Sequence, residues 1–111
     1  MVVAYDEKLA ERIEALLLPR RKYPAKKMFG GIAYFLKGNL CVGIYKDKLI
    51  VRLDPTTMFD LLKKPHTHPF DITGRPMRGW IMVEPAGLKR SASLKFWIQQ
   101  ALSYVSKLPK K

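Results

Sequence analysis

Hydrophobic residues recur with helical spacing near both ends of the chain. The first such segment, residues 6–18, carries an apolar stripe at positions i, i+4, i+7 and i+8: Leu9, Ile13, Leu16 and Leu17. Asp6 can cap the first turn of this helix, and Pro19 ends it. A second helical pattern starts at Ser91 or Ser93, so we predict a long helix near each end of the chain.

The middle of the chain alternates between apolar and polar residues, which is typical of β-strands. The segments with this pattern are residues 26–29, 32–37, 40–46, 48–53 and 77–84, with a short further candidate at 70–72 inside a loop of residues 65–76. Gly38-Asn39 and Lys46-Asp47 are the expected hairpin turns, and a short helix is expected over residues 55–63. The order α-β-β-β-α-β-β-α predicts a two-layer α+β fold, with an antiparallel sheet of four to five strands and three helices.

Side chains alternate across a strand, so each strand contributes one set of residues to each face of the sheet. The set that we expect to face the helices is mostly aliphatic: Ile32, Tyr34, Leu36, Leu40, Val42, Ile44, Leu49, Val51, Leu53, Ile81 and Val83. The opposite set also contains large apolar residues: Ala33, Phe35, Cys41, Gly43, Tyr45, Ile50, Arg52, Arg78, Trp80 and Met82. A sheet face that is open to water normally carries polar residues, so we expect something to cover this second face.

Two kinds of cover fit the second face. A homodimer partner or the chain's own long loop would bury the candidate interface residues, which are Phe35, Tyr45, Ile50, Trp80 and Met82. Alternatively, the bases of single-stranded nucleic acid would stack on aromatic rings of this set, with Arg52 and Arg78 near the phosphates.

The chain of 111 residues fits a single domain, residues 1–111, and its charge narrows the range of partners. It holds 21 Lys and Arg residues against 9 Asp and Glu residues, a net charge of +12, which favours polyanions such as nucleic acid. Candidate phosphate contacts outside the second face are the basic segment Arg20, Arg21, Lys22, Lys26 and Lys27, together with Lys63, Lys64, Lys89, Arg90 and the tail residues Lys107, Lys110 and Lys111. Such contacts give affinity without sequence choice, and a solvated basic surface is the open alternative.

Cys41 is the only cysteine, which excludes an internal disulfide and fits a reducing compartment such as the cytoplasm. We expect it to be a small strand residue rather than a nucleophile, because nothing in the sequence places a base beside it. No apolar run approaches the roughly 18 residues of a membrane span, so we expect no membrane partner.

Two further groups of residues could carry chemistry. His66-Thr67-His68 offers two imidazoles, but the chain has no further histidine to complete a metal site, so we expect a solvated loop and no cofactor. Arg52 and Arg75 need either a carboxylate partner or an anionic ligand. The expected carboxylates are those of Asp71, Glu84 or a partner subunit.

Four motifs follow one another along the chain: Lys27-Met28-Phe29-Gly30-Gly31-Ile32-Ala33, Gly38-Asn39-Leu40-Cys41, Leu49-Ile50-Val51-Arg52 and Thr73-Gly74-Arg75-Pro76-Met77-Arg78-Gly79-Trp80. Together with a closing helix around Trp97-Ile98, they resemble the N-terminal domain of the TfoX (Sxy) family, which is named for bacterial regulators of natural competence. The resemblance implies a two-layer α+β fold similar to that of type III secretion chaperones, and it implies no catalytic residues. The full-length regulators also carry a second, helical C-terminal domain.

We therefore expect a cytoplasmic, non-enzymatic domain that acts by regulatory interaction with nucleic acid or another protein, in the setting of transcription control. We also expect it to form a homodimer. One alternative function is a chaperone-like protein-binding homodimer without nucleic-acid binding. The other is an enzyme that acts on a small anion through Arg52 and Arg75.

Overall fold

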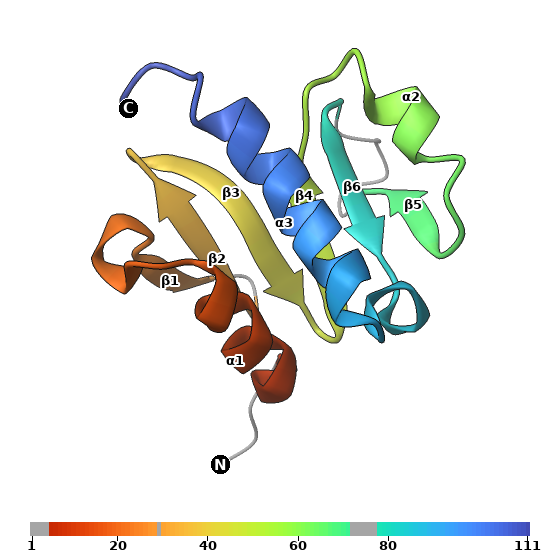
Figure 1. Cartoon of the computed structure of the whole chain (residues 1–111), viewed down its shortest axis with the longest axis horizontal. Helices are drawn as coiled ribbons and strands as arrows, with labels where there is room; N and C mark the ends of the chain where they lie inside the picture. Colours follow the sequence, from red (N-terminus) through yellow and green to blue (C-terminus); the bar gives the residue numbers. More distant parts are fainter. Residues whose placement is uncertain (1–4, 29, 72–77) are drawn as a thin grey trace.

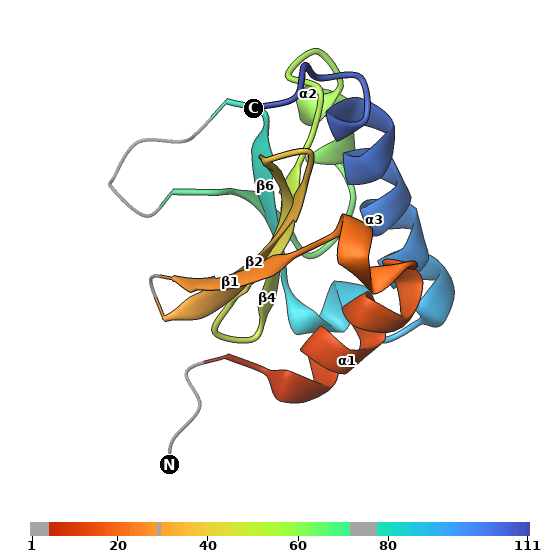
Figure 2. The ribbon, with the colours of Figure 1, turned by 90° about the vertical axis from the view of Figure 1, so that its left-hand side faces the viewer.

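The computed structural model describes residues 5–28, 30–71 and 78–111, and it has two layers (Figure 1). The elements follow this order along the chain, with η marking a 3₁₀ helix: α1 (Glu7–Leu16), η1 (Arg20–Lys22), β1 (Ala25–Met28), β2 (Gly31–Leu36), β3 (Asn39–Tyr45), β4 (Lys48–Arg52), α2 (Met58–Leu61), β5 (Thr67–Pro69), β6 (Trp80–Val83), η2 (Pro85–Leu88) and α3 (Ser91–Val105). One layer is a six-stranded antiparallel sheet with the strand order β1-β2-β3-β4-β6-β5. Helices α1 and α3 lie on one side of this sheet (Figure 2), which confirms the predicted two-layer α+β fold.

The start of α1 is capped as the sequence predicts. The Asp6 carboxylate accepts hydrogen bonds from the backbone N–H groups of Lys8 (3.0 Å) and Leu9 (3.1 Å). The helix ends at Leu16, two residues before the predicted end, and Leu16 is exposed although it belongs to the predicted apolar stripe. The buried stripe is therefore narrower than predicted.

The central helix α2 is a single turn rather than the predicted helix over residues 55–63. Asp54 explains the later start, because its carboxylate accepts hydrogen bonds from both the N–H (2.9 Å) and the hydroxyl (2.8 Å) of Thr56. These bonds hold the chain in a local turn, which competes with the first turn of a helix.

Turn residues set the ends of the central strands. The first hairpin turn consists of Lys37 and Gly38, with φ angles of 53° and 81°, and Asn39 pairs with Leu36 as the first residue of β3. The turn is thus one residue earlier than the predicted Gly38-Asn39. The Lys46-Asp47 turn is confirmed by the pairing of the residues on either side of it.

The prediction that residues 65–76 are mainly loop is wrong at β5, where Thr67–Pro69 pairs with β6. At the predicted strand 70–72, the Phe70 N–H donates to the Trp80 carbonyl at 3.2 Å, and Ile72 lies outside the described residues. The predicted strand 77–84 corresponds to the shorter β6. An edge strand has a sheet partner on one side only, so it tolerates a proline and needs no apolar alternation, which hides it in the sequence.

The core lies between the sheet and the helices α1 and α3. It contains nine of the residues that alternation assigned to the helix side: Ile32, Tyr34, Val42, Ile44, Leu49, Val51, Leu53, Ile81 and Val83. Their helical partners include Leu9 and Ile13 of α1 and Leu94, Ile98 and Ala101 of α3. The two-face prediction is therefore confirmed for these positions.

A β-bulge reverses the prediction at Leu40 and Cys41. Tyr34 pairs with Val42 while Phe35 pairs with Leu40, so the β3 strand has one residue more than β2 at this point. The extra residue, Cys41, is fully buried in the core, and Leu40 lies beside Phe35 on the opposite face. Strict alternation cannot foresee a bulge, because the extra residue puts the side chains before it out of phase with those after it.

Candidate functional site

The candidate site is the sheet face that no described helix covers, on the left of the sheet in Figure 2. Residues paired across strands point to the same side of a sheet, so the register places them in rows. The middle row crosses all six strands: Lys26, Ala33, Gly43, Ile50, Met82 and His68. We call this surface the open face, and its flanking positions are Phe35, Leu40, Arg52 and Trp80 on one side of that row, and Tyr45 and Lys48 on the other.

The centre of the open face is apolar and its flanks are aromatic. Ala33 is 4% exposed and Ile50 is 6% exposed, although no helix lies over them. Gly43, between them, carries no side chain, and a Cβ atom there would lie 2.9 Å from the carbonyl oxygen of Ile32. The half-buried side chains around this floor are those of Phe35, Tyr45, Trp80 and Met82. A flat apolar group would therefore contact these half-buried side chains rather than the floor beneath them.

Arg52 and Trp80 face each other on adjacent strands. The guanidinium carbon of Arg52 lies 5.5 Å from the centre of the Trp80 ring, and the centre of the Phe70 ring lies 6.3 Å from the centre of the Trp80 ring, with the two planes tilted by 42°. Among the described residues, no carboxylate lies within 4.0 Å of Arg52, so the expected pairing with Asp71 or Glu84 is wrong. A guanidinium over an indole is stabilised by the ring's negative face and keeps its charge available.

Phe70 is a residue of this site that the sequence analysis missed. Its position in a loop rich in Pro and polar residues gave no reason to place it beside Trp80. The pairing of β5 with β6 carries the chain past Trp80 and brings the two rings together. An aromatic residue just after a strand at the sheet edge would have been the signal, had that strand been recognised.

The charges around the open face differ in whether a carboxylate neutralises them. Lys48 Nζ lies 3.1 Å from Asp47 Oδ1, and His68 Nε2 lies 3.4 Å from Glu84 Oε1. In contrast, Lys26 and the exposed Arg78 have no carboxylate within 4.0 Å in the described part of the chain. Lys26 and Arg52 thus give the open face a net positive charge, while Arg78 lies before β6 and outside the paired rows.

The predicted basic segment does not form one site with the open face. Arg20, Arg21 and Lys22 form η1, which precedes β1 on the helix side of the molecule (Figure 2). The Arg20 guanidinium donates to the Tyr23 carbonyl at 2.9 Å and lies 3.9 Å from the Glu14 carboxylate. Arg20 therefore holds η1 against α1, which is a structural role.

Of two other predicted basic residues, Lys27 lies away from the open face and Arg75 is not among the described residues. Lys27 pairs with Ile32, which belongs to the core side, and its ammonium group lies 5.9 Å from the Tyr5 ring. Arg75, in the Gly74-Arg75-Pro76 motif, lies outside the described residues. The structure thus divides the predicted basic residues between the two layers of the fold.

The remaining candidate groups for chemistry are the histidines of residues 66–68 and Cys41. His68 pairs with Glu84, and in the described ranges no cluster of three or more metal-ligating side chains includes it. Burial raises the pKa of the Cys41 thiol to about 11, which keeps it protonated at neutral pH and unreactive. The helices of the described segments are all too short or too polar to cross a membrane.

Fold and site together define a small α+β domain with a helix-covered face and an open aromatic, basic face. The sequence model of the TfoX N-terminal domain family matches residues 15–104, from α1 to the last turn of α3. The chain therefore belongs to the TfoX N-terminal domain family, as its motifs indicated. All six strands lie inside the matched region, while the segment that follows α3 lies beyond it. No curated protein sequence matches the chain.

Proposed function

We propose that this protein is a non-enzymatic regulatory domain that binds single-stranded nucleic acid on its open face, in the setting of transcription control. The observation that carries the proposal is the stacked pair of Arg52 and Trp80, placed beside an apolar floor and without a carboxylate partner in the described residues. Aromatic rings on a sheet bind unpaired bases by stacking, and nearby cations bind the phosphates.

The energetics of such a complex would have two parts. Stacking a base on an aromatic ring contributes about 1–3 kcal/mol and depends little on the base. The net charge of +12 adds long-range attraction for phosphates, which salt weakens by screening and counterion competition. We therefore propose binding with weak sequence preference and strong dependence on salt.

A second copy of the chain is the competing occupant of the open face, and the half-buried apolar side chains of Phe35, Tyr45 and Met82 favour it. The charges oppose it, because a symmetric contact would put Lys26 and Arg52 of two highly basic chains in one interface. A polyanion meets the same surface with complementary charge. We therefore place nucleic acid first and the homodimer second.

Fluorescence anisotropy with a labelled single strand of about 12 nucleotides tests the proposal at two salt concentrations. We expect binding at low salt, preference over a duplex of the same sequence, and quenching of the half-buried Trp80 but not of Trp97, which is 3% exposed. Absence of binding at low salt would contradict the proposal. So would a stable dimer in light scattering that Trp80→Glu converts to monomers, because a second copy would then occupy the face.

A further inference from the structure

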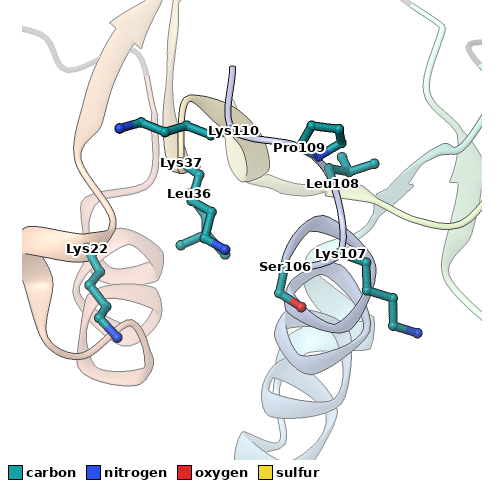
Figure 3. Close-up of a pocket in the computed structure, with 8 residues that line it drawn as sticks. All are labelled: Lys22, Leu36, Lys37, Ser106, Lys107, Leu108, Pro109 and Lys110. Atoms are coloured by element: carbon teal, nitrogen blue, oxygen red, sulfur yellow. The ribbon is translucent and has the colours of Figure 1, made fainter.

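A second surface lies on the helix side of the molecule, next to the end of α3. There a cleft of about 830 Å³ lies between η1 on one side and, on the other, the segment that follows α3; Leu36 and Lys37, at the end of β2, also line it (Figure 3). Half of the eight residues that line it are lysines: Lys22, Lys37, Lys107 and Lys110. They come from three segments that are far apart in sequence, around residues 22, 37 and 107–110, so only the fold brings them together.

Hydrogen bonds hold the walls of this lysine cleft in place. The side-chain amide of Asn39 donates to the Pro109 carbonyl at 2.9 Å, and the Lys111 N–H donates to the Lys37 carbonyl at 2.9 Å. These bonds fix the segment after α3 along the β2–β3 turn. The opposite wall, η1, is held by the contacts of Arg20 described above. The lysine backbones are therefore anchored, while their side chains remain free to adjust.

The charges in the cleft are all of one sign. None of the residues that line it is acidic, and in the described ranges none of its four ammonium groups lies within 4.0 Å of a carboxylate. Lys107 also faces Asp54, whose carboxyl pKa is lowered chiefly by hydrogen bonds from Thr56 and further by this lysine. Lys22, Lys37 and Lys110 are thus the principal charges, and their flexible side chains can turn towards an anion in the cleft.

The end of α3 does not cancel this positive charge. A helix C-terminus carries a partial negative charge on its unpaired carbonyl groups. Here the N–H groups of Ser106 and Leu108 donate to the carbonyls of Leu102 (2.9 Å) and Val105 (3.0 Å). Those carbonyls are already bonded within the chain, so the ammonium groups dominate the field in the cleft.

The cleft also has an apolar part, formed by Leu36, Leu108 and Pro109. Its volume lies within the roughly 300–1,000 Å³ of typical small-molecule sites. Lysine ammonium groups bind phosphates as point charges and adapt to several phosphate positions. A ligand that suits both parts carries adjacent phosphates and a flat, weakly polar group.

We propose that the lysine cleft binds a small phosphorylated ligand of the nucleoside triphosphate class, with its phosphates at Lys22, Lys37 and Lys110 and its base against Leu36 and Leu108. This inference does not depend on the open face, which lies on the other side of the sheet. It assigns the cleft a ligand of three or four negative charges, which matches the number of its lysines.

Calorimetric titration of the full chain with ATP, without divalent metal and at low salt, tests this assignment. The double variant Lys22→Gln/Lys37→Gln should weaken ATP binding by about tenfold or more. The matched control Lys89→Gln/Lys95→Gln removes the same charge from exposed positions outside the cleft and should change the affinity by less than about twofold. Equal weakening by both variants, or no heat of ATP binding, would overturn the proposal.

Inorganic tripolyphosphate has no base, so comparing its affinity with that of ATP measures what the base contributes. Weaker binding of tripolyphosphate than of ATP supports a base seated on the apolar part, whereas equal affinity would contradict the nucleoside assignment. Single-strand binding by the cleft variant should match that of the charge-matched control. The ATP titration thus tests the cleft, and the single-strand titration tests the open face. Either proposal can fail without the other, because only open-face variants should affect stacking.

Discussion

The two faces of the sheet are both rich in apolar residues, yet they differ in kind. The helix-covered face carries aliphatic side chains that are almost completely buried, such as Leu49, Val51 and Ile81 at 0% exposure. The open face carries half-buried rings and an arginine around a floor of small and medium residues. Apolar alternation alone therefore does not identify the core face of a sheet, because the core face is the one on which the helices pack.

Two tyrosines on adjacent strands show the same difference. Tyr34 is fully buried on the helix side, where its hydroxyl donates to the Glu14 carboxylate at 2.7 Å. Burial, followed by that hydrogen bond, raises the pKa of Tyr34 well above its usual value. Tyr45, on the open face, is half-buried, and the Lys46 ammonium group lies 5.5 Å from its ring. One ring completes the core, and the other is available to a partner.

Substitutions at two adjacent residues of β4 should show the largest difference between the two faces. Leu49→Ala removes a core side chain and should lower the free energy of unfolding by about 3 kcal/mol. Ile50→Ala, on the open face, should cost less, about 2 kcal/mol, because side chains of the same face cover it in place of a helix and can close over the gap. Urea denaturation of both variants measures the difference. Equal costs would mean that the two faces are packed equally well.

The pH dependence of stability tests whether Cys41 lies in the core, where the bulge places it. Burial raises its thiol pKa to about 11, so the folded protein holds this proton more tightly than the unfolded chain. Its contribution to stability is therefore complete below pH 9 and is lost as the pH rises towards 11, by roughly 2 kcal/mol. Cys41→Ala should flatten this part of the stability profile. An unchanged profile would indicate that the thiol is not in the core.

Trp80→Ala tests the function of the open face without disturbing the core. Losing one stacking ring should weaken single-strand binding by about 1–3 kcal/mol, with little change in the salt dependence, because the phosphate contacts remain. The control Trp80→Phe keeps an aromatic ring and should retain most of the affinity. Anisotropy titrations of the three proteins would contradict the assignment if Ala and Phe behaved alike.

Arg52→Lys should give the smallest effect. It keeps the positive charge but removes the planar group over the Trp80 ring, so binding should weaken by about 0.5–1 kcal/mol. Arg52→Gln removes the charge as well and should also reduce the salt dependence. If both variants reduced the salt dependence equally, the salt dependence would not follow the charge at position 52. Arg52 would then not contact phosphate.

Much of the fold could be predicted because its signals are local. The Asp6 cap and the two helix periodicities depend on residues within a turn or two of each other. The alternation of β2, β4 and β6, and of β3 after its bulge, likewise separates the core side from the open side. This pattern is enough to assign Phe35, Tyr45 and Trp80 to one face.

Other features could not be predicted because they depend on a partner segment. The bulge that exchanges Leu40 and Cys41 exists only relative to β2, and β5 is a strand only because β6 pairs with it. For the same reason Phe70 was missed at the open face. Arg20 could not be separated from its basic neighbours without the position of Glu14 on α1.

The sequence by itself determined the class of fold, the family, the two-sided character of the sheet and the excess of positive charge. These follow from periodicity, motifs and composition, which are properties of neighbouring residues or of the whole chain. Only the tertiary structure decided which basic residues share a surface, that Arg52 lies on Trp80, and that Lys22, Lys37 and Lys110 surround one cleft. The physical reason is that these contacts join segments far apart in the chain, whose relative positions are set by packing of the core and by pairing between strands.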